Sequence, residues 1–410
     1  MDERADPPAG PTGAAWRRLG DQGGLRLESA RLLQVDLPFR RPVVTAVGVH
    51  RHRPLVLVQL VCRTDGGTSV EGWGECAALA DATYDAEDVD VAFASLRDVL
   101  LPALLAAATR TGSLPSVGSL PADVRRRGRP LAWSALEMAV GDAHLRAAGD
   151  PLAAVLGVTA SAVAPGAVLG LPTSADALVA DLGRLGDEGY ARVKVKVAPG
   201  VEQLLVDVLG GGAGAGIPVQ VDANGSYGPA TLDGLDTLDR LGLLCSEQPL
   251  ARDDLAGHRD LVARLTTPVC LDESLGSPAE VVAAVSSGAC SVVCVKPSRL
   301  GGIAACLDVV DWCRAAGVPW WFGGMFESGY GRHALAALAA LPGPTLPGDL
   351  APASTYLAAD LVDPVPVTRD LSSGALLIAV HRGPGIAPLP WADAIGAHLV
   401  RDVAVSGPSG

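Results

Sequence analysis

Six short apolar runs constrain the fold of this chain more than any other feature. They are Ala191–Lys196, Ile217–Asp222, Leu243–Glu247, Thr267–Asp272, Ser291–Lys296 and Val318–Phe322. The first five end in a charged residue, at positions 196, 222, 247, 272 and 296, so successive charges are 26, 25, 25 and 24 residues apart. A step of this size accommodates one strand, one helix and two loops. Its repetition is typical of a parallel α/β barrel.

The charged ends of these runs predict one shared site. In such a barrel the carboxyl ends of the strands meet around one mouth. If residues 163–169 form the first strand, Lys196 ends strand 2 and Lys296 ends strand 6, which face each other across an eight-membered ring. Asp222, Glu247 and Asp272 then end strands 3, 4 and 5. We therefore expect three adjacent carboxylates between two lysines on opposite walls.

The three carboxylates predict a bound cation. Clustered carboxylates repel one another unless a cation lies among them. Three oxygen ligands without histidine or thiolate at the same level favour a hard ion, Mg²⁺ first and Mn²⁺ as the alternative. Such an ion would stabilise a second negative charge developing on a substrate carboxylate, as in an enediolate. A lysine would then remove the proton α to that carboxylate.

The remaining sequence predicts a second domain and excludes some partners. Strand-like runs precede helical periodicity in residues 28–155, which indicates an α+β domain before a barrel over residues 156–373. Residues 1–27 read as a mobile extension, and residues 374–410 as a segment that packs back on the first domain and ends in a loose tail. The net charge of −13 argues against a nucleic-acid partner, and the absence of an apolar run of about 18 residues argues against a membrane span.

The eight cysteines indicate a reduced, cytoplasmic setting. Cys245, Cys270 and Cys294 each lie two residues before a charged strand end. We expect them to be buried and free of disulfide bonds, one layer below the carboxylates at a depth of about 6–7 Å, and therefore not to form a zinc site.

The chain resembles the enolase superfamily in its muconate-lactonising branch, and more closely the o-succinylbenzoate synthase / N-acylamino acid racemase family. The resemblance runs from about residue 28 to residue 400. Its motifs are Glu71-Gly-Trp-Gly-Glu-Cys76, Ala135-Leu-Glu-Met-Ala-Val140, Lys194-Val-Lys196, Val221-Asp-Ala-Asn224, Glu247-Gln-Pro-Leu250, Leu271-Asp-Glu-Ser274, Val295-Lys-Pro297 with Arg299, and Gly323-Gly-Met-Phe-Glu-Ser-Gly-Tyr-Gly-Arg332.

The resemblance implies a modified TIM barrel, (β/α)₇β, whose mouth is covered by an N-terminal α+β capping domain. It implies that Asp222, Glu247 and Asp272 bind Mg²⁺ and that Lys196 and Lys296 are the acid–base pair. It assigns supporting or substrate-binding roles to Lys194, Asn224, Tyr84, Arg299, Gly324, Met325 and Glu327, with a capping loop around residues 45–53 closing over the substrate. It also implies a homo-oligomer, a dimer or an octamer.

The sequence departs from the family pattern at four positions, which are Val47, Val168, Cys294 and Ser298. None belongs to the expected metal set, so they bear on the identity of the substrate more than on the type of reaction. The first expectation is o-succinylbenzoate synthase, a lyase that dehydrates a succinyl-hydroxycyclohexadiene carboxylate in menaquinone biosynthesis. The alternative is N-acylamino acid racemase, an isomerase, or an enzyme that performs both reactions on a small carboxylate.

Overall fold

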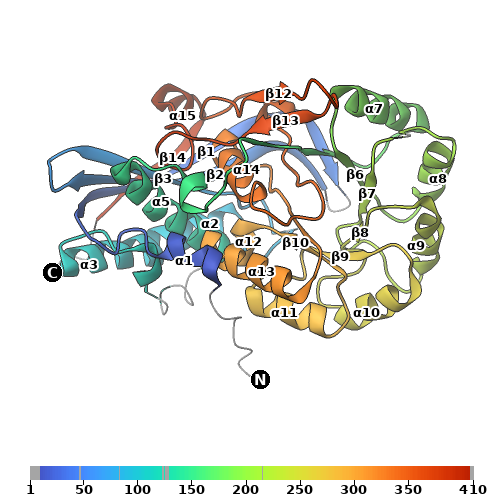
Figure 1. Ribbon diagram of the computed structural model, residues 1–410, viewed down its shortest axis with the longest axis horizontal. Coiled ribbons are helices and arrows are strands. Elements are labelled where there is room, and N and C mark those ends of the chain that lie inside the picture. Colours follow the sequence, from blue (N-terminus) through green and yellow to red (C-terminus); the bar gives the residue numbers. More distant parts are fainter. Residues whose placement is uncertain are drawn as a thin grey trace.

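An antiparallel sheet forms the base of the capping domain (Figure 1). The computed structural model describes residues 10–45, 48–82, 84–121, 124, 129–214 and 216–406. Four strands lie in the order β14–β1–β2–β3, with β1 Leu25–Thr45, β2 Gly48–Thr64, β3 Ser69–Cys76 and β14 Leu399–Val405. Valine and leucine dominate β2, as expected for side chains that pack on a pleated surface.

Helices of the capping domain cover this sheet. They are α2 Val89–Ser95, the π-helical turn η1 Leu96–Leu100, α3 Leu101–Thr111, η2 Val117–Ser119, α5 Pro130–Ala148 and α6 Leu152–Val155. The backbone of α5 approaches β3 closely, because a Cβ atom at Gly74 would lie 1.9 Å from the carbonyl oxygen of Ala135. The glycines of the Glu-Gly-Trp-Gly-Glu motif therefore permit this packing.

One helical stretch in the described part of the chain, Val89–Thr111, is long and apolar enough to cross a membrane by length and composition, with a mean hydropathy of 1.7. Its side chains Leu96, Leu100 and Leu104 are buried in the core of the capping domain. We therefore interpret the stretch as a core helix of this domain.

Seven parallel strands form the barrel (Figure 1). They are β5 Gly166–Leu169, β6 Arg192–Lys196, β7 Val219–Asp222, β8 Ser246–Glu247, β9 Val269–Leu271, β10 Val292–Val295 and β11 Trp320–Phe322. The segment at Asp349 lies between the two ends of this sheet. The N–H of Asp349 donates to the Phe322 carbonyl, and the N–H of Gly166 donates to the Gly348 carbonyl. These bonds close the ring.

Helices connect the strands and surround the barrel. They are α7 Ala175–Glu188, α8 Glu202–Gly210, α9 Leu232–Leu238, η3 Asp239–Leu241, α10 Leu255–Arg264, α11 Pro278–Ser286, α12 Pro297–Leu300, α13 Ile303–Ala316 and α14 Gly329–Ala339. The short helix η4 Ala353–Thr355 follows, and α15 Ala392–His398 lies against β1 of the capping sheet. The predicted fold class, a barrel of parallel strands with a capping domain, is confirmed.

The first barrel strand differs from its predicted extent. The run expected to be one strand, residues 163–169, is divided at Pro165, which has no N–H to donate. β4 Ala162–Val163 pairs with β13 Leu376–Ala379 in a small sheet that also contains β12 Val367–Arg369, and only β5 belongs to the barrel. Part of the C-terminal segment therefore pairs beside the barrel, while β14 pairs with β1 of the capping sheet.

Part of the N-terminal segment expected to be a mobile extension is packed in the fold. Residues Pro11–Arg17 form α1, which lies against α13. The Trp16 side chain is fully buried, and its Nε1–H donates to Glu137 Oε1 at 2.8 Å. The sequence pattern did not reveal this contact, because Trp16 is a single apolar anchor among Gly, Pro and Arg residues.

Candidate active site

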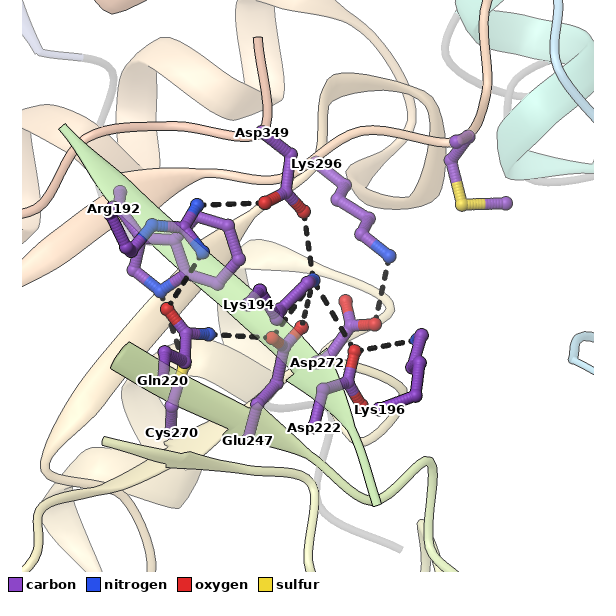
Figure 2. A network of polar contacts seen from close by, with 12 residues as sticks. Arg192, Lys194, Lys196, Gln220, Asp222, Glu247, Cys270, Asp272, Lys296 and Asp349 are labelled. Atoms are coloured by element: carbon purple, nitrogen blue, oxygen red, sulfur yellow. Dashed lines mark hydrogen bonds and ion pairs between the residues drawn. The ribbon is translucent and has the colours of Figure 1, made fainter. Parts of the chain in front are cut away.

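The barrel mouth brings together two lysines and three acids in the order expected from the sequence (Figure 2). The strand register sets Lys196 opposite Asp222, and Asp222 opposite Glu247. Lys196 Nζ donates to Asp222 Oδ2 and to Asn224 Oδ1, both at 2.7 Å. Asn224, at a left-handed φ of 45°, also donates to Glu273 Oε1 at 2.8 Å. This arrangement holds the Lys196 ammonium at the end of β6.

Lys296 lies on the other side of the acids, after β10. Its Nζ donates to Asp272 Oδ2 and to Tyr84 Oη, both at 2.8 Å. Arg299 bonds the other oxygen of Asp272 through Nη1 and the Cys294 carbonyl through Nη2 at 2.8 Å. Tyr84 comes from the capping domain, so this domain contributes directly to the wall around Lys296.

The three lysines of the site are the only lysines in the chain. Of the 32 lysine and arginine residues in the chain, only Lys194, Lys196 and Lys296 are lysines. An arginine keeps its proton at any ordinary pH, whereas a lysine ammonium can lose its proton in a suitable environment. This distribution is the compositional signal that singles out the site.

A third lysine lies one layer deeper. Lys194 Nζ contacts Glu247 Oε2 at 3.0 Å, Asp222 Oδ2 at 3.3 Å and Asp349 Oδ2 at 2.8 Å. The sequence analysis did not name Asp349 as a site residue. Its position could have indicated it, because Asp349 ends the last barrel element just as the other acids end their strands.

Burial and neighbouring charges shift the pKa values of these groups. Burial alone would raise the pKa of Asp222, but the ammonium groups of Lys196 and Lys194 outweigh it and hold this pKa at about 2. Burial raises the pKa of Glu247, and the negative charge of Asp222 adds to this effect. Burial would lower the pKa of Lys296, but the nearby Tyr84 and other groups raise it well above its usual value. In this arrangement the neighbouring groups favour the protonated form of Lys296.

The cysteines below the mouth are free and buried, as predicted. All eight cysteines lie in the described part of the chain, and none of them forms a disulfide. Cys245, Cys270 and Cys294 pack with Trp321 and Val292 inside the barrel.

The predicted depth is wrong for Cys294. Its Sγ and a carboxylate oxygen from each of Glu247 and Asp272 lie within 4.8 Å of one another. The reason is the register between β9 and β10, because Val292 is paired with Cys270 and Cys294, two residues further on, therefore lies level with Asp272. Gln220 Nε2 also donates to Glu247 Oε2 at 2.7 Å and holds this carboxylate toward the lower layer.

A cavity between the capping domain and the barrel opens onto these groups. Its walls include Lys196, Asn224 and Lys296 from the barrel, Tyr84 from the capping domain, and the predicted contact residues Gly324 and Met325. The capping loop expected around residues 45–53 contributes His50, His52 and Arg53, and the motif that ends at Arg332 also contributes Phe326 and Arg332. Phe39 and Leu79 are lining residues that the sequence analysis did not name. Apolar lining residues come from both domains, Phe39 and Leu79 from the capping domain and Val168, Met325 and Phe326 from the barrel, so the cavity suits a molecule with a charged group at the lysines and an apolar part.

Glu327 and Arg299 do not line this cavity. Glu327 Oε1 accepts from the Met325 N–H at 2.8 Å, and its other oxygen pairs with Arg332. Glu327 therefore shapes the loop that carries Met325. Among the family departures, Val168 lines the cavity, Cys294 lies beneath it, and Ser298 is on α12. Val47 lies outside the described residues.

The donor set fits a hard divalent cation. Carboxylate oxygens of Glu247 and Asp272 lie close together, and Asp222 and Glu247 share the Lys194 ammonium. Oxygen donors of this kind suit Mg²⁺ or Mn²⁺. The nearest non-oxygen donor is Cys294, and burial raises the pKa of its thiol well above the usual value. The acids are therefore the groups that would hold such an ion.

Both domains of the chain match known protein families. Residues 28–157 match the mandelate racemase / muconate lactonizing enzyme N-terminal domain, and residues 177–387 match the enolase C-terminal domain-like family. The chain is 39% identical to the N-succinylamino acid racemase of an Amycolatopsis species, over 89% of this chain and 96% of the relative. It is 32% identical to the o-succinylbenzoate synthase of Bacillus subtilis, over 88% of this chain and 94% of the relative.

Solved structures agree with this assignment. A probable mandelate racemase from Alicyclobacillus acidocaldarius is 34% identical and superposes with a TM-score of 0.82, over 92% of this chain and 97% of the other. A member of the enolase superfamily from Listeria innocua, 26% identical, superposes with a TM-score of 0.81 over 93% and 99% of the two chains.

Proposed function

Because the chain belongs to the mandelate racemase / muconate-lactonizing enzyme family of the enolase superfamily, we propose that it removes the proton α to a carboxylate of a small succinylated substrate. The observation that carries the proposal is the distribution of lysine. The chain has three lysines, and Lys196 and Lys296, which follow β6 and β10 and contact Asp222 and Asp272, line one cavity. A general base requires a group that can lose its proton, which arginine cannot do.

The roles follow from these positions. Lys196 takes the α-proton on its face, and Asp222 and Asn224 orient its ammonium afterwards. Asp222, Glu247 and Asp272 would hold Mg²⁺, with Mn²⁺ as the alternative. Once bound, the ion would stabilise the negative charge that develops on the substrate carboxylate. The apolar residues that line the cavity and Tyr84 exclude water from the reacting carbon.

Racemisation of an N-succinylamino acid is the first candidate reaction. In this reaction Lys196 takes the proton from one face and the Lys296 ammonium delivers a proton to the other face, so both lysines are used. The relatives from Amycolatopsis and Thermus thermophilus, at 39% and 37% identity, carry this name.

Dehydration to o-succinylbenzoate is the second candidate, although it was the first expectation from the sequence. Here Lys196 would take the proton and return it to the departing hydroxide as water leaves, while Lys296 stays a cation. The contacts of Lys296 with Asp272 and Tyr84, which hold it as an ammonium, favour this reaction. The relative from Bacillus subtilis carries the synthase name. One site can perform both reactions, since they share the proton abstraction.

The test follows α-proton exchange in deuterated water for each enantiomer of an N-succinylamino acid, together with formation of o-succinylbenzoate. We expect the wild type to exchange both enantiomers and Lys196→Ala to lose both reactions by about 10²–10⁴-fold. Circular dichroism confirms that the variant is folded. Exchange by Lys196→Ala of the enantiomer whose proton faces Lys196, at the wild-type rate, would remove the basis of the proposal.

The setting of this activity is part of the proposal. Eight free cysteines support a cytoplasmic location. Assembly into a dimer or an octamer stays a prediction, which sedimentation of the purified chain can test.

A further inference from the structure

A closed ring of buried polar side chains lies below the mouth (Figure 2). Arg192 Nη1 donates to Gln220 Oε1 at 3.0 Å, and Gln220 Nε2 donates to Glu247 Oε2 at 2.7 Å. Lys194 Nζ joins Glu247 to Asp349, and Asp349 Oδ1 accepts from Arg192 Nη2 at 2.7 Å. Each member is less than a tenth exposed, so none of these charges is screened by bulk water.

The ring gives Lys194 two kinds of partner. On one side are Glu247 and Asp222, at 3.0 and 3.3 Å, which are proposed to hold the divalent ion. On the other side is Asp349, whose Oδ2 lies 2.8 Å from Lys194 Nζ. Asp349 is not one of the proposed metal ligands. Lys194 Nζ also lies over the ring of Trp321, 4.9 Å from the ring centroid. The shortest ion-pair contact of Lys194 therefore draws it away from the ligand carboxylates.

The position of this ammonium matters for metal binding. A cation that approaches Glu247 and Asp222 must share their oxygens with Lys194, and two positive centres in a buried site repel one another. If Asp349 did not accept from Lys194, the ammonium would form its contacts with Glu247 and Asp222 alone. It would then compete with the divalent ion for the same oxygens.

We propose that Asp349 is a positioning residue, which holds Lys194 toward the ring-closing segment at Asp349 and so keeps Glu247 and Asp222 available to a divalent cation. This inference rests on the proposed function, because it presupposes that the three acids bind the ion. It gives Arg192 a role as well, since this buried guanidinium fixes the other oxygen of Asp349. Partners of this kind outside the ligand set commonly change metal affinity by about 10–100-fold when they are removed.

The experiment is a double-mutant cycle read out by metal binding. Mg²⁺ is titrated by calorimetry, without substrate, into the wild type, Asp349→Asn, Lys194→Met and the double variant. We expect Asp349→Asn to lower Mg²⁺ affinity by about 10–100-fold. In the Lys194→Met background the same substitution should have little effect, because no ammonium is left to compete. Asp142→Asn, which removes another buried carboxylate far from the ring, is the matched control and should retain the affinity of the wild type.

The outcomes separate this inference from the proposed function. No Mg²⁺ binding by the wild type, or binding unchanged in Glu247→Gln, would defeat the proposed metal site itself. If the wild type and Asp349→Asn bind Mg²⁺ with equal affinity, the proposed role of Asp349 is overturned. An equal loss in both backgrounds would show that Asp349 acts by its charge or by general stability, and would also overturn it.

A second pair of variants covers the case in which Asp349→Asn does not fold, since this change leaves Arg192 buried beside a neutral amide. The double variant Arg192→Met/Asp349→Asn removes both members of the buried pair and is compared with Arg192→Met alone. We expect Arg192→Met/Asp349→Asn to bind Mg²⁺ more weakly than Arg192→Met does. Equal affinities in these two proteins would refute the positioning role.

Discussion

Trp16 joins the N-terminal helix to both domains, and its removal should destabilise the whole chain. The indole is fully buried, and its Nε1–H donates to Glu137 on α5 of the capping domain. The same carboxylate oxygen accepts from the Ala304 N–H at the start of α13 in the barrel. A Cβ atom at Gly141 would lie 2.0 Å from the indole ring, so the ring packs directly on the backbone of α5.

The magnitude follows from these contacts. Replacement of a buried tryptophan by alanine costs about 3–5 kcal/mol through the cavity that it leaves. Trp16→Phe keeps most of the apolar contact and loses a hydrogen bond to a carboxylate, which is worth about 1.5–3 kcal/mol. With a urea slope of about 3 kcal/mol per molar, Trp16→Ala should unfold at a midpoint about 1–1.7 M below the wild type.

Urea unfolding followed by circular dichroism checks this prediction. Trp391→Ala is the matched control, because that side chain is 45% exposed and should change the midpoint little. If Trp16→Ala unfolds within about 0.2 M of the wild type, α1 is not part of the folded core and the packing argument fails.

Three further predictions concern the site and its pH dependence. Lys296→Arg keeps a cation but cannot act as a base near neutral pH, so it should exchange the enantiomer whose proton faces Lys196 without inverting it; full racemisation measured by chiral chromatography would show that Lys296 is not the second base. Burial raises the pKa of Glu75 from 4.5 to about 7, so the folded state binds this proton more tightly and stability should fall as pH rises from about 4.5 to 7. Glu75→Gln should show a smaller fall of the unfolding midpoint across this range, and an unchanged pH profile would contradict the shift. An amine-specific reagent should modify Lys196 before the other two lysines, because its side chain is 11% exposed against 4% and 6%; mass spectrometry that finds Lys194 labelled first would contradict this order.

The sequence by itself determined the architecture and the order of the charged groups. A repeated step of 24 to 26 residues is a local property, since each strand and helix is encoded by its own run of side chains. Alternation along a strand then selects which residues face inward, which is why Lys194 could be expected beneath Lys196. The positions of Lys196, Asp222, Glu247, Asp272 and Lys296 followed from these two rules.

Only the tertiary structure decided the levels at which these side chains meet. The register between β8 and β9 sets Glu247 beside Cys270 instead of Asp272, and the register between β9 and β10 brings Cys294 to the level of Asp272. No single strand carries this information, because stagger is a property of the closed ring. The role of Asp349 arises in the same way, from a segment that joins the two ends of the sheet far along the chain. The burial of Trp16 likewise depends on a contact 121 residues away, which no local pattern encodes.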